Sequence, residues 1–291
     1  VDVVFGIPGV HTIELYRGLA ASSVRHVTPR HEQSAGFMAD GYARASGRVG
    51  VAFVITGPGL TNTLTAMAQA RADSVPMLVV SSVNALPSLG KGLGYLHELP
   101  DQQSLAAQVA LSSDRVVAAG ELHPALENAL AVSQNRRPGP RHIEVPLDVA
   151  GQPFDGPDGT ASEPQTVVIS ETGLARAVVL LEQAKQPIIL AGGGIRRSSA
   201  VVQALAEKLN APVVQTINAR GLMHGHPLGV PASPSLEAVR DLIGGSDVVL
   251  ALGTELGPTD FDMDATGTMP SMQNLIRVDV CAEQLARRDC D

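Results

Sequence analysis

The hydrophobic pattern of this 291-residue chain alternates between two kinds of segment. Nearly continuous apolar runs, such as residues 49–55 and 77–82, are typical of strands buried on both faces of a parallel sheet. Between the runs, apolar residues recur at three- and four-residue spacing, which predicts amphipathic helices. The predicted strands are residues 3–5, 24–27, 49–55, 77–82, 141–146, 187–191, 212–216, 247–252 and 274–279. The predicted helices are residues 12–19, 122–135, 170–183, 200–209 and 235–243, with two more beginning near Glu32 and after Gly59.

Strands and helices alternate through both halves of the chain, which predicts an α/β protein with two doubly wound parallel-sheet domains. Residues 150–166 interrupt the pattern with glycines, prolines and short polar residues, the composition of a linker. We therefore predict a first domain at residues 1–149, a linker at 150–166 and a second domain at 167–291, which we expect to be cut near its end.

Composition narrows the classes of function. Apolar residues make up 44% of the chain and charged residues 17%, as in a globular protein. The formal net charge of −8, without a basic stripe, argues against nucleic acid or an anionic membrane surface as partner. No apolar run reaches the roughly 18 residues that span a bilayer. Two cysteines exclude a disulfide framework by their number, and we expect a cytoplasmic protein.

Glu32 is the first candidate for chemistry. Pro29 ends the strand at residues 24–27, and Glu32 then falls in the first turn of a helix, where the helix dipole favours a negative charge. Small and apolar neighbours suit a carboxyl group with a proton-transfer role. Dipole complementation alone is the commoner reason for an acid at such a position. The apolar face of this predicted helix comprises Ala35, Met38, Ala39, Tyr42 and Ala43.

Two glycine turns follow predicted strands. Gly57-Pro58-Gly59 permits close backbone approach at the start of a helix, which suits an anion or the edge of a cofactor. Pro8-Gly9 follows the first strand in the same way. Each turn alone is weak evidence for a ligand, because an ordinary connection between a strand and a helix has the same sequence pattern.

Four blocks of sequence occur together in the order and spacing of a known family. They are Phe-Gly-Ile-Pro-Gly at 5–9, Arg-His-Glu-Gln with Met-Ala-Asp-Gly-Tyr-Ala-Arg within 30–44, Thr-Gly-Pro-Gly with Asn62 at 56–62, and Arg-Pro-Gly-Pro with Ile-Glu-Val-Pro-Leu-Asp-Val within 137–149. The first half resembles the pyrimidine-binding domain of thiamine-diphosphate-dependent enzymes of the acetolactate synthase and 2-oxo acid decarboxylase superfamily. The second half resembles the Rossmann-like central domain of the same enzymes.

The resemblance implies a role for Glu32. In such enzymes the acid at this position hydrogen-bonds the aminopyrimidine ring and promotes loss of a proton from the thiazolium carbon. The cofactor-binding residues that we expect are Pro8, Gly9, Glu32, Gly57, Pro58, Gly59 and Asn62.

The resemblance also indicates a substrate class, a 2-oxo acid that loses CO₂. Leu96-His97-Glu98 stands where acetolactate synthases carry Phe-Gln-Glu, and residues 111–114 lack their lysine. Residues 96–102, 253–257 and 260–262 instead look like those of 5-guanidino-2-oxopentanoate decarboxylases. Acidic loops would attract the cationic tail of that substrate. The candidate substrate residues are Gln33, His97, Glu98 and Asp101, and Glu255, Asp260, Asp262 and Asp264 are further acids in such loops.

Other features of the family are missing from the sequence. The Gly-Asp-Gly motif that holds Mg²⁺ and the diphosphate does not occur, so we name no metal ligand and expect the diphosphate-binding domain to lie outside this chain. In the family the site forms between subunits, which implies a homodimer or homotetramer. The turn Gly192-Gly193-Gly194 lacks the full spacing of a dinucleotide fingerprint, and we do not favour bound FAD. The alternatives are acetolactate synthase-type carboligation, and a non-catalytic thiamine- or nucleotide-binding module that needs a partner subunit.

Overall fold

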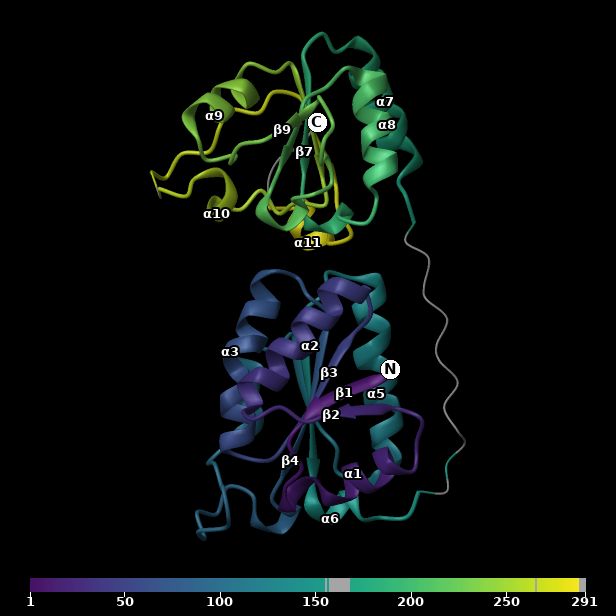
Figure 1. Cartoon of the computed structure of the whole chain (residues 1–291), viewed down its shortest axis with the longest axis vertical. Helices are drawn as coiled ribbons and strands as arrows, with labels where there is room; N and C mark the ends of the chain where they lie inside the picture. The colour runs from purple at the N-terminus through teal and green to yellow at the C-terminus, as the bar shows by residue number, and fades with distance from the viewer. Residues whose placement is uncertain (155, 157–167, 265, 288–291) are drawn as a thin grey trace. The chain divides into compact units, whose positions relative to one another are not determined.

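The structure is a computed structural model that describes residues 1–154, 156, 168–264 and 266–287. The chain divides into two compact units, Val1–Thr166 and Val167–Asp291, each built around one sheet (Figure 1). Of the predicted linker at 150–166, residues 155 and 157–166 lie outside the described residues. Strands pair in parallel in both sheets, which confirms the predicted α/β class.

The first unit contains a six-stranded sheet of order β2-β1-β3-β4-β6-β5. Its strands are β1 (Val3–Gly6), β2 (Arg25–Val27), β3 (Gly50–Val54), β4 (Met77–Val83), β5 (Ser112–Arg115) and β6 (Pro140–Pro146). Its helices are η1 (Val10–Thr12), α1 (Ile13–Ala20), α2 (Glu32–Ser46), α3 (Pro58–Ala72), η2 (Leu86–Ser88), α4 (Gln102–Ala107), α5 (Ala119–Asn135) and α6 (Leu147–Ala150).

Alternate side chains of these strands point to opposite faces of the sheet, and each face has its own core. Val3 and Phe5 of β1 pack with buried alanines of α2 and α3, whereas Val4 packs with the group that α1 and α5 cover. Helices therefore cover both faces, as Figure 1 shows for α2 and α3 on one side and α5 on the other. Burial on both faces explains why β3 and β4 are nearly continuous apolar runs.

The second unit contains a five-stranded sheet of order β11-β10-β7-β8-β9, with α7 and α8 on one face and α9 and α10 on the other. Its strands are β7 (Pro187–Ala191), β8 (Val213–Gln215), β9 (Gly229–Val230), β10 (Val248–Leu252) and β11 (Leu275–Val278). Its helices are α7 (Glu171–Gln183), η3 (Gly193–Ile195), α8 (Ser199–Leu209), η4 (Ile217–Ala219), α9 (Glu237–Gly244), α10 (Pro258–Phe261) and α11 (Ala282–Leu285).

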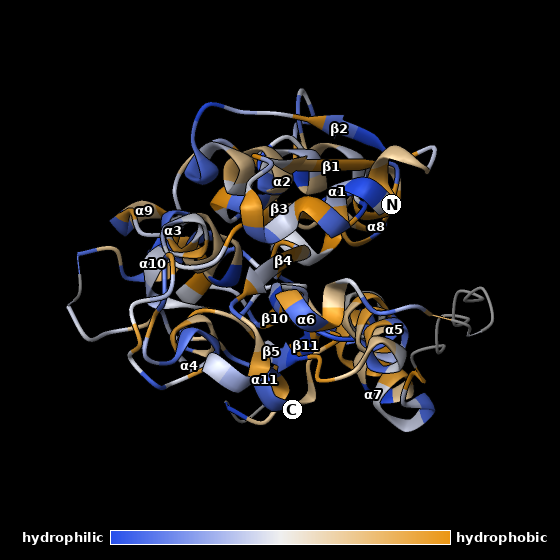
Figure 2. Cartoon of the chain, turned by 90° about the horizontal axis from the view of Figure 1, so that it is seen from below, coloured by the Kyte–Doolittle hydropathy of each residue, from blue (hydrophilic) through white to orange (hydrophobic). Residues whose placement is uncertain are grey.

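Several details differ from the sequence-based expectation, and among the helices α4, α6, α10 and α11 were not predicted. The strand predicted to be buried at 24–27 is β2, an edge strand with Arg25 exposed, because only β1 pairs with it; Figure 2 shows it hydrophilic beside the hydrophobic β1. The strands β5 and β9 were not predicted, since β5 consists of polar residues and β9 of two residues. Met38, assigned to the apolar face of α2, is 39% exposed.

Candidate functional site

The candidate site lies at the edge of the first sheet where the parallel strands end. The chain passes from β1 to β2 on one side of β1 and then returns to β3 on the other side. This reversal makes a topological switch point between β1 and β3, the place where open α/β sheets bind ligands. Pro8-Gly9 follows β1, Glu32 follows β2, and Gly57 follows β3. The sequence-predicted cofactor residues therefore share this edge.

Glu32 and Asn62 form a hydrogen-bonded pair at this edge. Asn62 Nδ2 donates to Glu32 Oε2 at 3.0 Å, and both side chains are half-buried. Glu32 is the first residue of α2, whose N-cap is His31; His31 Nδ1 accepts from the main-chain N–H of Gln33 at 3.1 Å. Within the described residues, Asn62 is the only group that hydrogen-bonds the carboxyl group of Glu32. The second carboxyl oxygen is thus left for a ligand.

Close packing of α2 against α3 brings this pair together. A Cβ atom on Gly36 would lie 2.6 Å from Ala66 Cβ, so the two helices touch where Gly36 has no side chain. Gly36 and Ala66 each lie one helical turn beyond Glu32 and Asn62, so the close contact and the hydrogen bond are successive turns of one interface.

The far ends of the same two helices are joined by an arginine. Arg44 pairs with Asp40 of its own helix at 2.6 Å and with Asp73, the C-cap of α3, at 2.7 Å. Gln69 Nε2 also donates to Asp73 Oδ2 at 2.7 Å. The helix pair is therefore fixed at both ends.

The two glycine turns enclose Ile55. A Cβ on Gly9 would lie 2.7 Å from Ile55 Cγ2, and one on Gly59 would lie 2.6 Å from Ile55 Cγ1. Both glycines thus have a packing reason to be glycine. The turn after β1 and the turn after β3 therefore both pack against Ile55.

Gly57 has a conformational reason as well. Its φ of +61° and ψ of −112° are unfavourable for a residue with a side chain. A Cβ there would also lie 2.4 Å from the carbonyl oxygen of His97, whose own φ is +57°. The loop that carries His97 therefore covers this turn directly.

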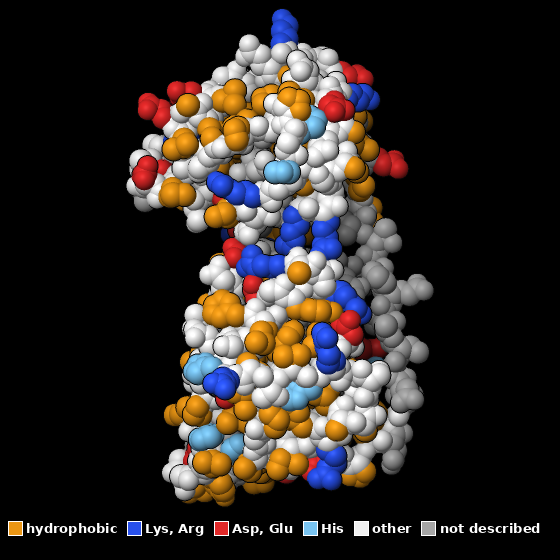
Figure 3. Space-filling model, viewed as in Figure 1, with side chains coloured by type: hydrophobic (Ala, Val, Ile, Leu, Met, Phe, Trp, Pro, Cys, Tyr) orange, Lys and Arg blue, Asp and Glu red, His pale blue; other side chains and the backbone are white. Residues whose placement is uncertain are grey.

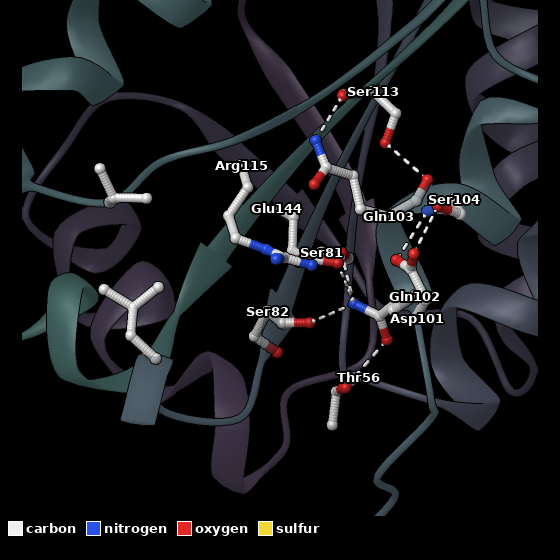
Figure 4. A network of polar contacts seen from close by, with 12 residues as sticks. Thr56, Ser81, Ser82, Asp101, Gln102, Gln103, Ser104, Ser113, Arg115 and Glu144 are labelled. Atoms are coloured by element: carbon white, nitrogen blue, oxygen red, sulfur yellow. Dashed lines mark hydrogen bonds and ion pairs between the residues drawn. The ribbon is translucent and has the colours of Figure 1, made fainter. Parts of the chain in front are cut away.

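A buried polar network that was not predicted lies behind the Gly57 turn, centred on Gln102 (Figure 4). Gln102 Oε1 accepts from the Gly57 main-chain N–H at 2.7 Å and from Thr56 Oγ1 at 2.9 Å. Gln102 Nε2 donates to Ser82 O at 2.9 Å and to Glu144 Oε2 at 3.1 Å. A signal for it existed in the polar residues near the carboxyl ends of the buried strands β4 and β6, namely Ser81, Ser82 and Glu144.

Glu144 is completely buried and is paired with Arg115 Nε at 2.5 Å. Burial raises the pKa of Glu144, and the Arg115 guanidinium opposes that rise. Both carboxyl oxygens accept hydrogen bonds from N–H donors, the arrangement of an ionised carboxylate.

Next to this network, His142 is fully buried between two hydroxyl groups, Ser81 Oγ and Ser113 Oγ, each at 2.7 Å from one ring nitrogen. Burial lowers the pKa of His142 to about 3. The imidazole is therefore neutral in the folded protein.

His97 and His11 face each other beside the Gly57 turn, with ring centroids 5.9 Å apart. Burial lowers the pKa of His11, while a hydrogen bond with Asn84 raises it. Among the described residues, Ser82 Oγ and His97 Nδ1 are buried without a hydrogen-bond partner. Both belong to segments at or after the carboxyl end of β4, so the predicted site edge contains unsatisfied polar atoms.

Two of the predicted substrate acids bind their own loop. The Glu98 carboxylate accepts from the main-chain N–H groups of Gly92, Gly94 and Tyr95 at 2.8–3.1 Å. Desolvation raises the pKa of Glu98, but these hydrogen bonds together hold it below its usual range. A guanidinium group at Glu98 would have to share the carboxylate with them.

Asp101 is the N-cap of α4 and accepts from Ser104 N at 3.0 Å and Ser104 Oγ at 2.5 Å, which lower the pKa of the carboxyl. Gln33 is exposed beside Glu32. Within the described residues, no hydrogen bond or ion pair links Gln33, His97, Glu98 or Asp101 to Glu32.

In the second unit, the glycines of the predicted Gly192-Gly193-Gly194 turn are explained by packing. A Cβ on Gly192 would lie 2.2 Å from Gly253 O, and one on Gly194 would lie 2.9 Å from Gly253 Cα. Two main-chain segments meet here, so these glycines do not by themselves indicate a nucleotide.

Of the four acids named from the sequence in this unit, Asp264 is exposed, and the other three accept hydrogen bonds from neighbouring groups. Asp262 accepts from Thr266 and from Gly267 N, which lower the pKa of its carboxyl, and Asp260 Oδ1 accepts from Ile217 N. Glu255 Oε2 accepts from Gln284 Nε2 at 3.4 Å.

Two kinds of feature are absent from the described part of the chain. It contains no helix long and apolar enough to cross a membrane. It also contains no group of three or more His, Cys, Asp or Glu residues that could hold a metal ion.

The chain is therefore a two-domain α/β protein. At the switch-point edge of its first sheet, the Glu32 carboxyl group is held by the side-chain amide of Asn62. The chain belongs to the thiamine pyrophosphate enzymes. Residues 1–105 match the thiamine pyrophosphate enzyme N-terminal TPP binding domain, and residues 174–290 match the thiamine pyrophosphate enzyme central domain.

Curated relatives include a "Probable 2-ketoarginine decarboxylase AruI" of Pseudomonas aeruginosa, which is 47% identical over 96% of this chain and 50% of its own length. The "Acetolactate synthase isozyme 1 large subunit" of Escherichia coli is 30% identical over 99% of this chain and 51% of its own length. An "Acetolactate synthase" of Mycobacterium bovis is 34% identical over 93% of this chain and 44% of its own length. The chain spans about half the length of the curated relatives it matches.

The residues at the edge fit the pyrimidine half of thiamine diphosphate. A half-buried carboxyl group with one oxygen left for a ligand can hydrogen-bond a heteroaromatic ring nitrogen. The Gly57 turn, which only glycine adopts readily, and the unsatisfied polar atoms lie at the same edge. Thiamine diphosphate chemistry is thus supported by the family and by the donor and acceptor groups present.

Proposed function

We propose that this chain supplies the pyrimidine-binding half of a thiamine-diphosphate site, and that the complete enzyme decarboxylates a 2-oxo acid, with 5-guanidino-2-oxopentanoate as substrate. The observation that carries the proposal is the Glu32–Asn62 pair at the switch point. An acid at the start of α2 needs no partner on α3 merely to complement the helix dipole. The amide instead fixes the direction of the carboxyl group.

In this proposal the residues of the chain bind and orient. Glu32 would hydrogen-bond the aminopyrimidine ring, Asn62 holds the carboxyl group in place, and Pro8-Gly9 with Gly57-Pro58-Gly59 would line the cofactor site. When bound, the cofactor supplies a nucleophilic carbon for the ketone and an electron sink for loss of CO₂. The fixed carboxyl group lowers the cost of orientation, because it does not need to be ordered during the reaction.

The substrate is proposed from the relatives and from the loop at 90–102. The chain is 47% identical to a protein named as a probable 2-ketoarginine decarboxylase, and 30–34% identical to the acetolactate synthases. 2-Ketoarginine is 5-guanidino-2-oxopentanoate. The three main-chain N–H groups on Glu98 keep a carboxylate ionised and fixed on this loop, and a fixed carboxylate suits a planar guanidinium group. His97, Asp101 and Gln33 complete the proposed substrate surface.

Further parts of the proposal concern the assembly. We include Mg²⁺ with the diphosphate, held by residues outside this chain, and we leave FAD out because the Gly192 turn has a packing explanation. A cytoplasmic homodimer or homotetramer with the site between subunits is proposed from the resemblance. Large exposed apolar side chains on the first unit, among them Phe37 and Met38 of α2, are consistent with such an interface. Figure 3 shows apolar side chains on one face of each unit.

The test uses the complete polypeptide with thiamine diphosphate and Mg²⁺. Release of CO₂ is measured from 5-guanidino-2-oxopentanoate and from pyruvate under the same conditions, and acetolactate is assayed in parallel. The proposal expects CO₂ release with a much larger kcat/KM for the guanidino acid and no acetolactate. Acetolactate formation from pyruvate would replace it with the carboligase, and absence of any cofactor-dependent turnover with either acid would exclude both.

A further inference from the structure

Gln102 is a buried amide whose hydrogen-bonding groups are all used. It is 2% exposed and is the first residue of α4. The main-chain N–H of Gly57 can only donate and the carbonyl of Ser82 can only accept, so these two groups fix which end of the amide is oxygen and which is nitrogen. The Gln102 side chain therefore has one orientation.

That orientation is held from behind by a buried charge. Gln102 Nε2 donates to Glu144 Oε2, and the other oxygen of Glu144 accepts from Arg115 Nε. Removing one partner of a buried carboxylate is strongly unfavourable, so the contacts of Glu144 with Arg115 and Gln102 stabilise this arrangement together. The Gln102 side chain thus contacts Thr56 after β3, Ser82 of β4 and the buried Glu144 of β6, as Figure 4 shows.

On the side of the amide oxygen, Gln102 holds the main chain at the start of α3. Its Oε1 binds Gly57 N at 2.7 Å, and the carbonyl of Gly57 accepts the first helical hydrogen bond of α3, from Thr61 N at 2.9 Å. Asn62 is the next residue of that helix and reaches Glu32. A chain of direct contacts therefore runs from the buried charge through Gln102 and Gly57 to the Asn62–Glu32 pair.

We propose that Gln102 is a positioning residue of the cofactor site, which sets the Gly57 turn and the start of α3 without contacting the cofactor itself. The inference rests on the proposed function, since it assumes that this turn and Glu32 hold thiamine diphosphate. A residue that served only to stabilise the fold would alter unfolding without altering cofactor affinity in the folded protein.

Gln102→Glu is the informative substitution. It keeps an oxygen toward Gly57 and Thr56, but it replaces the donating nitrogen with an oxygen that faces Ser82 O and Glu144. When protonated, the new carboxyl group can donate again; when ionised, it repels Glu144. The charged and titratable groups around it are Glu144, Arg115 and Asp101, with His142 one hydrogen bond further through Ser81.

The experiment titrates thiamine diphosphate with Mg²⁺ into the complete enzyme by calorimetry at pH 5.5 and pH 8, and records thermal unfolding of each sample. The Kd of Gln102→Glu, relative to wild type, is expected to rise about 10-fold at pH 8 and to return toward wild type at pH 5.5. The matched control is Ser113→Ala on β5, an edge strand. This substitution removes the hydrogen bonds of Ser113 Oγ to His142 Nδ1 and to Gln103 O. It is expected to lower the unfolding midpoint and leave the Kd unchanged.

If Gln102→Glu does not fold, Thr56→Val is the milder variant, because it removes one of the two donors to Gln102 Oε1 and keeps the Gly57 N–H. A few-fold increase in Kd is expected. A Kd equal to wild type in a folded variant at pH 8, or an equal loss of affinity in Ser113→Ala, would overturn the positioning role alone. Failure of the wild-type enzyme to bind thiamine diphosphate would overturn the proposed function, and this inference with it.

Discussion

Asn62 on α3 donates its side-chain amide to Glu32 Oε2 on α2 at 3.0 Å, across 30 residues of sequence. The contact joins the helix that follows the edge strand to the helix that follows the central strand β3. It exists because the two helices pack closely enough for side chains at their first turns to meet. The direction of the Glu32 carboxyl group therefore depends on the packing of two helices and on Asn62.

Replacing Asn62 by alanine tests that dependence. With the donor gone, the Glu32 carboxyl group can rotate, and we expect kcat of the complete enzyme to fall roughly 10- to 100-fold, as is typical when a reacting group loses its orientation. Steady-state decarboxylation kinetics measure it. Thr65→Ala, an exposed threonine of the same helix, is the control and should keep wild-type kcat. Unchanged kcat in Asn62→Ala would mean that Glu32 is oriented by something else.

Two glycines of α2 make opposite predictions for stability. In Gly36→Ala the new Cβ would lie 2.6 Å from Ala66 Cβ, so the helices must separate, at a cost of about 1–3 kcal/mol of unfolding free energy. In Gly41→Ala no atom lies within 4 Å, and the higher helix propensity of alanine should stabilise the protein by up to about 1 kcal/mol. Urea unfolding measures both. Equal effects of the two substitutions would contradict the close packing at Gly36.

His142 makes stability depend on pH. Its folded pKa of about 3 lies below its ordinary value of 6.5, so between these values the unfolded chain binds a proton that the folded chain does not. This contribution to stability is present above pH 6.5 and is lost as pH falls toward 3, at up to about 1.4 kcal/mol per pH unit. Unfolding free energies at pH 4, 5, 6 and 7 should therefore fall less steeply for His142→Gln than for wild type. The exposed His224→Gln serves as control and should run parallel to wild type.

The substrate proposal predicts a selective effect at Glu98. Glu98→Gln removes the negative charge and replaces one acceptor of the loop N–H groups with a donor. We expect KM for 5-guanidino-2-oxopentanoate to rise more than KM for a 2-oxo acid with an uncharged side chain, because only the guanidino substrate loses a charge partner. Glu14→Gln, an exposed acid paired with Arg17, is the matched control. An equal change in KM for both substrates would show that Glu98 acts on the loop and not on the cationic tail.

Much of the fold could be predicted from the sequence because its strands are buried on both faces. β7 begins and ends where the apolar run 187–191 predicts it, and Glu32 opens α2 as the turn at Pro29 indicates. The two strands that were not predicted, β5 and β9, share a physical cause, because both lie at the edge of a sheet. β5 is built from Ser112–Arg115 at the edge of the sheet, where one neighbour suffices and no apolar run is required.

The site was predictable only in part, because its key relationships are tertiary. The resemblance named Glu32 and Asn62 separately, but their contact depends on the close approach of α2 and α3 at Gly36. Gln102 gave no periodic signal, since its role depends on groups from three strands that meet only in the folded sheet. The acid at Glu98 was interpreted as facing a substrate, and its bonds to the Gly92–Tyr95 backbone follow from a loop conformation that the sequence does not specify.

Glu32→Gln in the complete enzyme is the most direct test of the account. Glutamine keeps the size of the side chain and can still accept the hydrogen bond of Asn62, but it cannot act as a carboxyl group. Cofactor binding is measured by calorimetry and CO₂ release from 5-guanidino-2-oxopentanoate by a coupled assay. The account predicts that thiamine diphosphate binding is largely retained while decarboxylation is abolished. Wild-type turnover in Glu32→Gln would contradict it.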